Sequence, residues 1–539
     1  MQVHFANIWE DIADKVGDRT ALIHGDERVS WREHDEQAAR LAQAFIELGL
    51  QPDSKVALYL YNGIEYVTAQ YAAFKMRGVP INVNYRYSEG ELLYLLDNSD
   101  AEVLCFHSSL GDRVAKVLPK AEKLRAVIEV DDAPAGVNSE HVEGALRWHD
   151  VLASHEPAAR IEGQPDDIYM LYTGGTTGMP KGVMYTHGVF PIAIAGFGAA
   201  ISGLTPPTNV DELLALGDEL DAPPVWLAAC PQMHGTGMWL GTMAPLLLQG
   251  SVVTLTNRSF DAHELWQAVE REGVSVVVIV GDAFAKPMLR ALDEKGYQAP
   301  SLKTIVSSGV MWSTEVKEGL LKHLDVTLYD GLGSTEGAMG TTISTRAGVG
   351  TTAKFTTNPA VKVVTEDGRT VEPGSDEIGM VAAISASLGY FKDPEKSART
   401  FMVIDGVPHS LPGDWAKVAA DGSLILLGRG SNCINTGGEK VFPEEVEEAV
   451  KANPVVYDCL VVGVPDERFG ERIVAVVSLQ PGASANEASI VEGATEHIAR
   501  YKLPKSVIIV DRVQRAPNGK ADYPWAREVA RSGAAAKPA

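Results

Sequence analysis

Cysteine and long apolar runs are both scarce in this sequence of 539 residues. The most apolar run, Val274 to Val280, is too short to cross a bilayer and predicts a buried strand. The first residues have neither the basic start nor the apolar segment of a secretory signal peptide. No C-x-x-C pair or metal-binding spacing occurs among the four cysteines, which are Cys105, Cys230, Cys433 and Cys459. We therefore expect a cytoplasmic protein with reduced cysteines and no transmembrane segment.

Positive charge is also in short supply. The chain has 47 Lys and Arg against 71 Asp and Glu, a net charge of −24. A surface this negative argues against nucleic acid and anionic membranes as the main partners. Any site for an anionic ligand then needs its own local cations, so individual lysines and arginines become informative.

The hydrophobic patterns predict an α/β fold with more than one domain, because a chain this long exceeds what a single core supports. Strand and helix patterns alternate up to about residue 130 and again from 251 to 330, which predicts parallel sheets covered by helices. From residue 361 short strands and turns predict an antiparallel or barrel-like unit. The acidic stretch from Pro206 to Pro224 is interpreted as a solvated insertion, with the mouth of a pocket as the alternative.

The pattern changes near Gly428–Ser431, where a compact C-terminal segment begins that is long enough for a small domain. We expect helices at Pro443–Ala452 and Glu487–Arg500, with strands between and after them. Residues 532–539 are predicted to be disordered.

The segment Leu171–Met184 carries the strongest functional signal. Three glycines and three threonines fall within Thr173–Gly178, so backbone N–H groups can point inward with little side-chain bulk in the way. Lys181 adds a compact positive charge suited to phosphate oxygens. Pro180 before that lysine excludes a Walker A loop, and the glycine spacing excludes a Rossmann fingerprint. The predicted polyphosphate-binding residues are Thr173, Gly174, Gly175, Thr176, Thr177 and Lys181.

The order Tyr-Thr-Gly-Gly-Thr-Thr-Gly-x-Pro-Lys-Gly in this segment resembles the signature of the adenylate-forming superfamily. That group contains acyl-CoA synthetases, stand-alone adenylation domains and firefly-type luciferases. The resemblance implies a large N-terminal domain of stacked parallel αβα sheets with a small β-barrel-like subdomain, followed by a small mobile α+β domain. We place the N-terminal domain at residues 1–428, the hinge at 429–431 and the C-terminal domain at 432–531. ATP, Mg²⁺ and coenzyme A are the implied cofactor and co-substrates.

Two further motifs of that family follow in order. Ser307-Ser-Gly-Val310 comes after a predicted strand, and its small residues would let adenine lie against backbone. Asp330–Glu336 resembles the motif Asn/Asp-Gly-Tyr-Gly-x-Thr-Glu, in which Thr335 would contact the α-phosphate and Glu336 would hold Mg²⁺. Leu332 stands where an aromatic residue usually stacks on adenine, so weaker nucleotide affinity is expected. The implied nucleotide contacts here are Ser308, Gly309, Asp330, Gly331 and Leu332.

Three motifs near the C-terminus complete the resemblance. Asp414 would accept hydrogen bonds from both ribose hydroxyls, and Arg429 would supply a second ribose contact. Lys520, in a terminal Pro-x-Gly-Lys turn, would bridge the attacking carboxylate and the α-phosphate as the catalytic lysine. Ser431 replaces the usual Asp or Lys of the hinge, which predicts a looser hinge. The segment implied to approach the pantetheine arm of CoA contains Gly437, Gly438 and Glu439.

A histidine in a glycine-flanked loop is the candidate for the acyl pocket. His234, with Gly237 and Met238, resembles the gate beside that pocket, and a structural histidine is the alternative. Methionine and tryptophan at 233–239, 311–312 and 339 would suit a bulky apolar acid, or could be plain core.

The resemblance implies an ATP-dependent acyl-CoA synthetase that makes an acyl-AMP and then a CoA thioester. The wording of residues 428–441 and 519–523 is similar to the branch acting on long-chain and steroid side-chain carboxylates. A stand-alone adenylation enzyme serving a carrier protein, a ligase for medium-chain or aromatic acids, a luciferase-like oxygenase and a non-catalytic nucleotide-binding relative are the alternatives. The resemblance also admits a homodimer.

Overall fold

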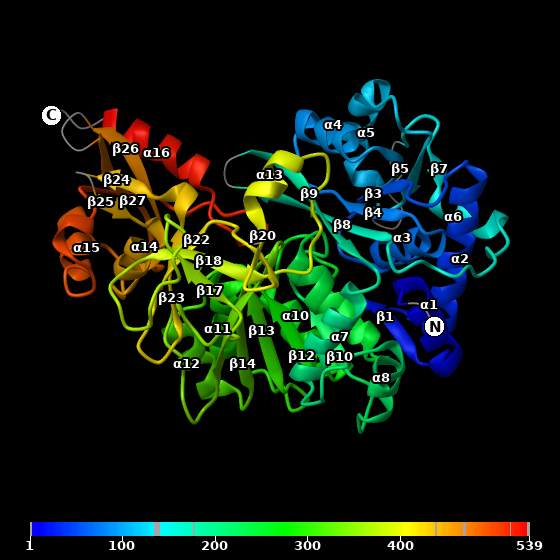
Figure 1. Cartoon of the computed structure of the whole chain (residues 1–539), viewed down its shortest axis with the longest axis horizontal. Helices are drawn as coiled ribbons and strands as arrows, with labels where there is room; N and C mark the ends of the chain where they lie inside the picture. Colours follow the sequence, from blue (N-terminus) through cyan, green and yellow to red (C-terminus); the bar gives the residue numbers. More distant parts are fainter. Residues whose placement is uncertain are drawn as a thin grey trace.

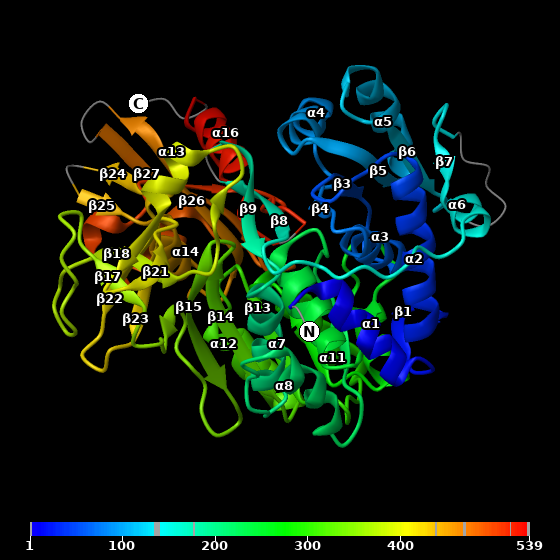
Figure 2. The same ribbon diagram turned by 45° about the vertical axis from the view of Figure 1, so that its right-hand side comes forward.

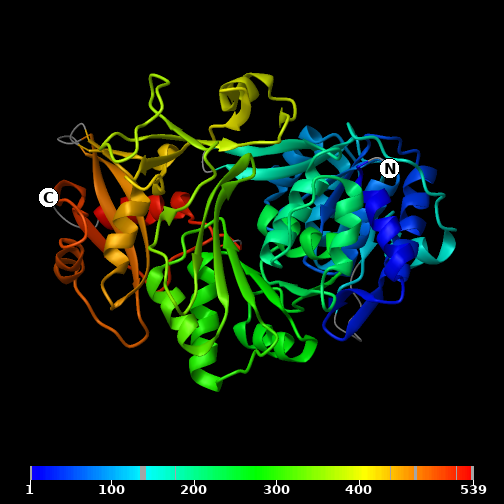
Figure 3. The same cartoon turned by 60° about the horizontal axis from the view of Figure 1, so that its bottom comes forward.

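The computed structural model describes residues 3–133, 141–175, 178–436, 439–466, 470–517 and 519–535. Figure 1 shows an N-terminal sheet with its helices (blue), a central sheet (green), a smaller β-rich unit (yellow) and a C-terminal unit (orange to red). The N-terminal sheet and the C-terminal unit lie on opposite sides of the central sheet, as Figure 3 also shows. The predicted α/β fold, with a large N-terminal part and a small C-terminal one, is confirmed.

The N-terminal sheet is parallel, with the strand order β4-β3-β5-β6-β7. Successive side chains of a strand point to opposite faces, so Val56 and Leu58 join one core while Ala57 and Tyr59 join another. Helices α2, α3 and α6 cover the first face, and α4 and α5 cover the second. The bounds are β3 (Lys55–Tyr59), β4 (Val79–Asn82), β5 (Ala101–His107), β6 (Ala126–Val130), β7 (Leu146–Arg147), α2 (Trp31–Glu47), α3 (Ile64–Lys75), α4 (Glu89–Asn98), α5 (Gly111–Val117) and α6 (Trp148–Ser154).

The central sheet is parallel from β1 to β14 in the order β1-β11-β10-β12-β13-β14. Its direction then changes, because β14 and β15 form an antiparallel hairpin whose turn is Thr335-Glu336. These two residues therefore stand at the carboxyl end of a parallel strand, where ligands usually bind in such sheets. The bounds are β1 (Thr20–His24), β2 (Glu27–Ser30), β10 (Val225–Ala228), β11 (Ser251–Thr254), β12 (Val276–Ile279), β13 (Thr304–Ser308), β14 (Thr327–Ser334), β15 (Gly337–Ser344), α7 (Phe190–Ile201), α9 (Ala244–Leu247), α10 (Ala262–Glu272), α11 (Gly281–Lys295) and α12 (Thr314–His323).

The glycine-rich segment is the tip of a β-hairpin formed by β8 (Ile168–Gly175) and β9 (Gly178–Thr186). Figure 2 shows this hairpin between the N-terminal sheet and the β-rich unit. Asn82 at the end of β4 anchors it, since its side chain bonds both the N–H and the C=O of Tyr172, at 2.6 and 2.8 Å. On the other side β19 (Gly389–Tyr390) pairs with β9.

The β-rich unit is antiparallel, as the short-strand pattern predicts. It has its own apolar core, to which Met339, Val381 and Ala416 contribute. Its elements are β16 (Lys354–Phe355), β17 (Lys362–Val364), β18 (Gly379–Ile384), α13 (Pro394–Thr400), β20 (Phe401–Ile404), β21 (Val407–Ser410), β22 (Asp414–Val418) and β23 (Leu424–Arg429).

The C-terminal unit is a five-stranded sheet with a separate core on each face. These cores begin at Ile434, whereas the core of the β-rich unit ends at Leu424. The predicted hinge falls in this interval, and its role as a hinge stays a prediction. The half-buried Cys433 lies there as well, while the other three cysteines are buried. The elements are β24 (Ile434–Thr436), β25 (Glu439–Val441), α14 (Pro443–Lys451), β26 (Val456–Asp466), β27 (Gly470–Leu479), α15 (Glu487–Ala494), β28 (Ser506–Ile509) and α16 (Tyr523–Ala535).

Three expectations from the sequence are wrong. Residues 206–224 contain a helix, α8 (Val210–Ala215), which buries Leu213 and contacts α1 and α7 instead of lining a pocket. The helix predicted at Glu487–Arg500 ends at Ala494. Helix α16 extends through the first four residues of the tail predicted to be disordered, and residues 536–539 lie outside the described residues.

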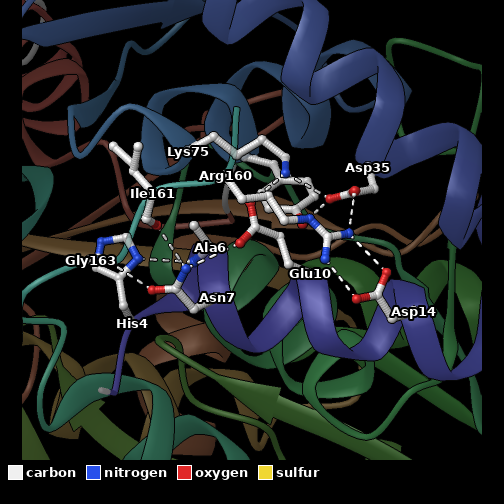
Figure 4. A network of polar contacts seen from close by, with 11 residues as sticks. His4, Ala6, Asn7, Glu10, Asp14, Asp35, Lys75, Arg160, Ile161 and Gly163 are labelled. Atoms are coloured by element: carbon white, nitrogen blue, oxygen red, sulfur yellow. Dashed lines mark hydrogen bonds and ion pairs between the residues drawn. The ribbon is translucent and has the colours of Figure 1, made fainter. Parts of the chain in front are cut away.

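A buried polar network fastens helix α1 (Phe5–Val16) to the N-terminal sheet (Figure 4). The Lys75 ammonium of α3 lies 2.7 Å from a carboxylate oxygen of Glu10 and 2.8 Å from one of Asp35. Arg160, from the segment leading to β8, reaches the other oxygen of Asp35 at 3.1 Å. The network thus joins α1, α2 and α3 to the strand that carries the glycine-rich tip. Within the described part of the chain, no helix has the length and hydropathy that a membrane span requires.

Candidate active site

A cavity of about 470 Å³ lies where the glycine-rich hairpin, the end of β14, the β-rich unit and the C-terminal unit meet. Its walls come from segments far apart in the chain, since β9 and β14 face residues from α14, β26 and the turn before α16. The cavity brings together many of the predicted site residues, namely Thr173, Gly174, Lys181, Gly309, Asp330, Gly331, Leu332, Thr335, Glu336, Asp414, Arg429 and Lys520.

The glycine-rich tip presents open backbone and a lysine to this cavity. Thr173 pairs with Lys181 across the hairpin. A Cβ added at Gly174 would meet nothing within 4 Å, so no protein atom blocks an approach there. The Lys181 ammonium lies 5.3 Å from the centroid of the Tyr390 ring, which steers the cation with a π face. Such an arrangement suits phosphate oxygens.

The Thr335-Glu336 turn is held by three hydroxyl groups. The Tyr390 hydroxyl donates to a carboxylate oxygen of Glu336 at 2.8 Å, and Ser410 Oγ donates to the Glu336 carbonyl at 3.1 Å. Tyr185 donates to the carbonyl of Thr335. Burial, with the nearby Glu336 charge, raises the pKa of Tyr390, so this hydroxyl stays a proton donor. The carboxylate is therefore fixed in orientation before any ligand arrives.

Glu336 fits the role of a partial Mg²⁺ ligand. Mg²⁺ is a hard cation that prefers carboxylate oxygen and commonly completes its shell with substrate phosphates and water. Among the described residues no cluster of three or more His, Cys, Asp or Glu side chains could hold a metal by itself. A metal at Glu336 would thus depend on the phosphates of a bound nucleotide.

A buried ion pair supports the strand that forms the cavity floor. Asp330 on β14 and Lys317 on α12 are 2.7 Å apart, and their side chains are only 6% and 1% exposed. Burial raises the pKa of Asp330, and the charge of Lys317 opposes that shift. The pair fixes the start of the segment Gly331-Leu332, which lines the cavity. Gly309 lies alongside with φ +96°, a conformation that favours glycine.

Asp414 and Arg429 face each other across strands β22 and β23. Arg429 Nε donates to Asp414 Oδ1 at 3.2 Å, and the Asp414 charge raises the pKa of the guanidinium. The second carboxylate oxygen, Oδ2, is buried and has no hydrogen-bond partner in the structure. A buried, unsatisfied carboxylate oxygen at a cavity wall is costly for the protein alone. It is therefore available to accept a hydrogen bond from a ligand hydroxyl.

Lys520 enters the cavity from the C-terminal unit on a tight turn, in which Gly519 has φ +73°. Within this turn the N–H of Ala516 donates to the Lys520 carbonyl at 2.9 Å. The surrounding protein lowers the pKa of the Lys520 ammonium by desolvation, and the charge of Arg429 lowers it further. A cation with little hydration interacts strongly with developing negative charge.

Comparison with known families agrees with this geometry. The family model described as "AMP-binding enzyme" matches residues 9–388, and "AMP-binding enzyme C-terminal domain" matches residues 445–520. This chain belongs to the AMP-binding enzyme family. The resemblance drawn from the motifs is thereby confirmed.

Relatives of this AMP-binding enzyme include two named ligases. The 3-oxocholest-4-en-26-oate–CoA ligase of Rhodococcus rhodochrous is 40% identical over 548 residues, covering 98% of this chain and 96% of that protein. The medium/long-chain-fatty-acid–CoA/3-oxocholest-4-en-26-oate–CoA ligase of Mycobacterium marinum is 39% identical over 539 residues, with coverage of 98% and 96%. Among solved structures, the anthranilate CoA ligase AuaEII in complex with anthranoyl-AMP is similar with a TM-score of 0.85. At 23% identity over 99% of this chain and 98% of that one, it supports the fold alone.

The predicted acyl-gate residues do not line the cavity of this AMP-binding enzyme. His234 is half-buried, and burial lowers its pKa to about 3, so the imidazole is neutral. A Cβ at Gly237 would lie 2.2 Å from the Pro231 carbonyl, which shows that close backbone packing demands this glycine. Met238 is 1% exposed and accepts a hydrogen bond from Gln70 at its sulfur. Their role beside an acyl group stays a prediction.

The apolar residues considered for the acyl pocket divide into two groups. Met311 lines the cavity. The others, each 1% exposed, belong to the buried interior: Met233, Met238, Trp312 and Met339.

Several other predicted residues lie at the margin of the described site. Ser308 pairs with Gly331 at the end of β13 but does not line the cavity. Glu439 is exposed on β25. Gly175 ends β8, where it pairs with Gly178. Outside the described residues lie Thr176, Thr177, Gly437 and Gly438.

Sequence reasoning missed the side chains that hold the predicted ones. Tyr390 is 54 positions from the Glu336 it binds, and Tyr185 is 150 positions from Thr335. Lys317 is closer to Asp330, yet an amphipathic helix routinely carries lysines. No local pattern marks any of these three as a site residue.

Proposed function

We propose that this chain is an ATP-dependent acyl-CoA synthetase for a bulky apolar carboxylic acid, such as a long-chain fatty acid or a steroid side-chain acid. One observation carries the proposal: Lys520 of the C-terminal unit shares a cavity with Glu336 and the Asp414–Arg429 pair. The names and the 38–40% identity of the relatives support the choice of acid.

In the first half-reaction a carboxylate oxygen of the acid attacks the α-phosphorus of ATP, the bond to the β-phosphate breaks, and pyrophosphate leaves. Lys520 neutralises the negative charge shared by the attacking carboxylate and the α-phosphate, and Lys181 binds phosphate oxygens. Asp414 Oδ2 accepts a hydrogen bond from the ribose, which fixes the position of the α-phosphorus. Mg²⁺, held by Glu336 and phosphate, offsets charge on the leaving pyrophosphate.

In the second half-reaction the thiolate of coenzyme A attacks the acyl carbon, and AMP leaves with the oxygen it received from the acid. This step needs no charge between carboxylate and α-phosphate. We therefore assign Lys520 to the first step, with the C-terminal unit turning about residues 429–431 between the steps. The segment around Glu439 would then approach the pantetheine arm.

Pyrophosphate release with Mg·ATP, measured with and without CoA, tests the proposal. The acids are acetate, benzoate, dodecanoate, palmitate and 3-oxocholest-4-en-26-oate. CoA-dependent turnover that is highest with the last three is expected. A preference for acetate or benzoate would contradict the choice of acid, and release with no acid would contradict the enzyme. A homodimer and a cytoplasmic location also stay predictions, which light scattering and cell fractionation would test.

A further inference from the structure

Helix α11 grips one residue of the C-terminal unit from the side. Lys286 and Arg290 lie one helical turn apart on α11, so their side chains share a face. Lys286 Nζ donates to the backbone carbonyl of Tyr457 at 2.7 Å. The ring of Tyr457 meets both cations, with Lys286 Nζ 5.3 Å and Arg290 Cζ 4.8 Å from its centroid. Cations over an aromatic face attract it, so Tyr457 is a point of attachment between the two parts of the chain.

The residue after Tyr457 begins a hydrogen-bonded path to the proposed catalytic lysine. The Asp458 carboxylate accepts two bonds from Arg515, both at 2.7 Å. Arg515 Nη1 then donates to the carbonyl of Gly519 at 3.1 Å, and Lys520 follows that carbonyl directly. The Asp458 and Arg515 side chains are 16% and 18% exposed. A bidentate pair of this kind has a fixed geometry, so a shift of Tyr457 is transmitted to Lys520.

The turn that carries Lys520 also rests on helix α11 itself. A Cβ added at Gly519 would lie 2.8 Å from Cβ of Ala283, in the first turn of α11. Gly519 therefore allows a close approach that a side chain would prevent. Helix α11 thus meets the C-terminal unit at two places, the Tyr457 ring and the Gly519 backbone.

We propose that Tyr457 is a positioning residue for Lys520, held by Lys286 and Arg290 so that the Lys520 ammonium occupies the cavity during attack of the carboxylate on the α-phosphorus. The inference rests on the proposed function and deepens it. Removal of the ring leaves the turn fastened to α11 at Gly519 alone, and Lys520 then occupies its place for a smaller fraction of the time. The transfer of the acyl group to CoA, which does not use Lys520, keeps its rate.

The test compares the two half-reactions in Tyr457→Ala, Tyr457→Phe and Arg290→Ala. The first is single-turnover pyrophosphate release from palmitate and Mg·ATP without CoA, and the second is thioester formation from preformed palmitoyl-AMP and CoA. Misplacement of a catalytic group by a fraction of an ångström predicts a loss of about tenfold or more in the first for Tyr457→Ala and Arg290→Ala. The second should stay within about twofold of wild type. Tyr457→Phe keeps the ring and the carbonyl, so it should rescue the first reaction.

Tyr501→Ala is the matched control, because this tyrosine is 45% exposed and meets only a cation of its own unit, Lys502. It should leave both half-reactions unchanged. The positioning role is overturned if Tyr457→Ala and Arg290→Ala adenylate at the wild-type rate, or if both half-reactions fall in parallel. Wild-type protein that forms no adenylate would instead overturn the proposed function and this inference with it. Arg290→Ala removes the same contact from the other side, so misfolding of Tyr457→Ala alone does not decide the matter.

Discussion

The Lys75 network of Figure 4 allows a quantitative prediction for the variant Lys75→Met. The Lys75 and Glu10 side chains are 4% and 5% exposed, so their ion pair is almost dry. Without the ammonium, Asp35 keeps bonds from Tyr71 and Arg160, at 2.5 and 3.1 Å. Glu10 keeps only the 3.1 Å bond from the Asn7 amide. A buried charge left without its partner costs about 3–5 kcal/mol of folding free energy.

Urea unfolding followed by tryptophan fluorescence measures this cost, since Trp9 on α1 is fully buried. With a denaturant slope of about 3 kcal/mol per M, the midpoint of the transition should fall by about 1–1.7 M. The double variant Lys75→Met/Glu10→Gln removes the stranded charge and should recover much of the loss. Arg399→Ala, which breaks a pair whose side chains are 76% and 78% exposed, should cost less than about 0.5 kcal/mol. A Lys75→Met loss below about 1 kcal/mol, or a double variant as unstable as the single one, would refute the reasoning.

Three further predictions concern the cavity. Asp414→Ala should raise KM for ATP by roughly 10- to 150-fold, because a hydrogen bond to a charged group contributes about 1.5–3 kcal/mol; steady-state kinetics with unchanged ATP affinity would contradict the ribose contact. Lys520→Ala should abolish adenylate formation while sparing thioester formation from preformed acyl-AMP, and equal loss of both would argue against its assignment. Because the pKa of Lys520 is lowered, its ammonium is lost at a lower pH than in a free lysine. Adenylation should therefore decline below about pH 10.4 on the basic side, whereas in Lys520→Arg any activity that remains should not show this decline. Tyr390→Phe should raise the Mg²⁺ concentration needed for half-maximal rate, since Glu336 loses its orienting donor; an unchanged Mg²⁺ dependence would show that the carboxylate needs no such support.

The sequence was most informative where a motif combines special backbone with one charged residue. The glycine-rich tip with Lys181, the turn at Glu336 and the turn at Lys520 all line one cavity, although the motifs are spread over most of the chain. Motif order predicted that meeting, and cross-strand pairing of Asp414 with Arg429 brought the third group to it.

The sequence was least informative where the role of a residue depends on a distant contact. Gly237 belongs to a glycine-rich loop that looks like a pocket, and only the structure shows the Pro231 carbonyl that its missing side chain would strike. Leu213 sits in an acidic, proline-bounded stretch, and tertiary packing makes it core. Helix α16 has no breaker-free apolar stripe as clear as that of α2, so its docking against β26 was not foreseen.

The distribution of the cysteines makes the natural chain ready for site-specific labelling. Cys105, Cys230 and Cys459 are at most 1% exposed. Cys433 is half-buried and lies between the last strand of the β-rich unit and the first strand of the C-terminal unit. Burial also raises the pKa of its thiol, so labelling should proceed slowly at neutral pH and faster in mild alkali. A maleimide dye would thus attach at the junction of the two units without any engineered residue, where its emission can follow their movement during turnover.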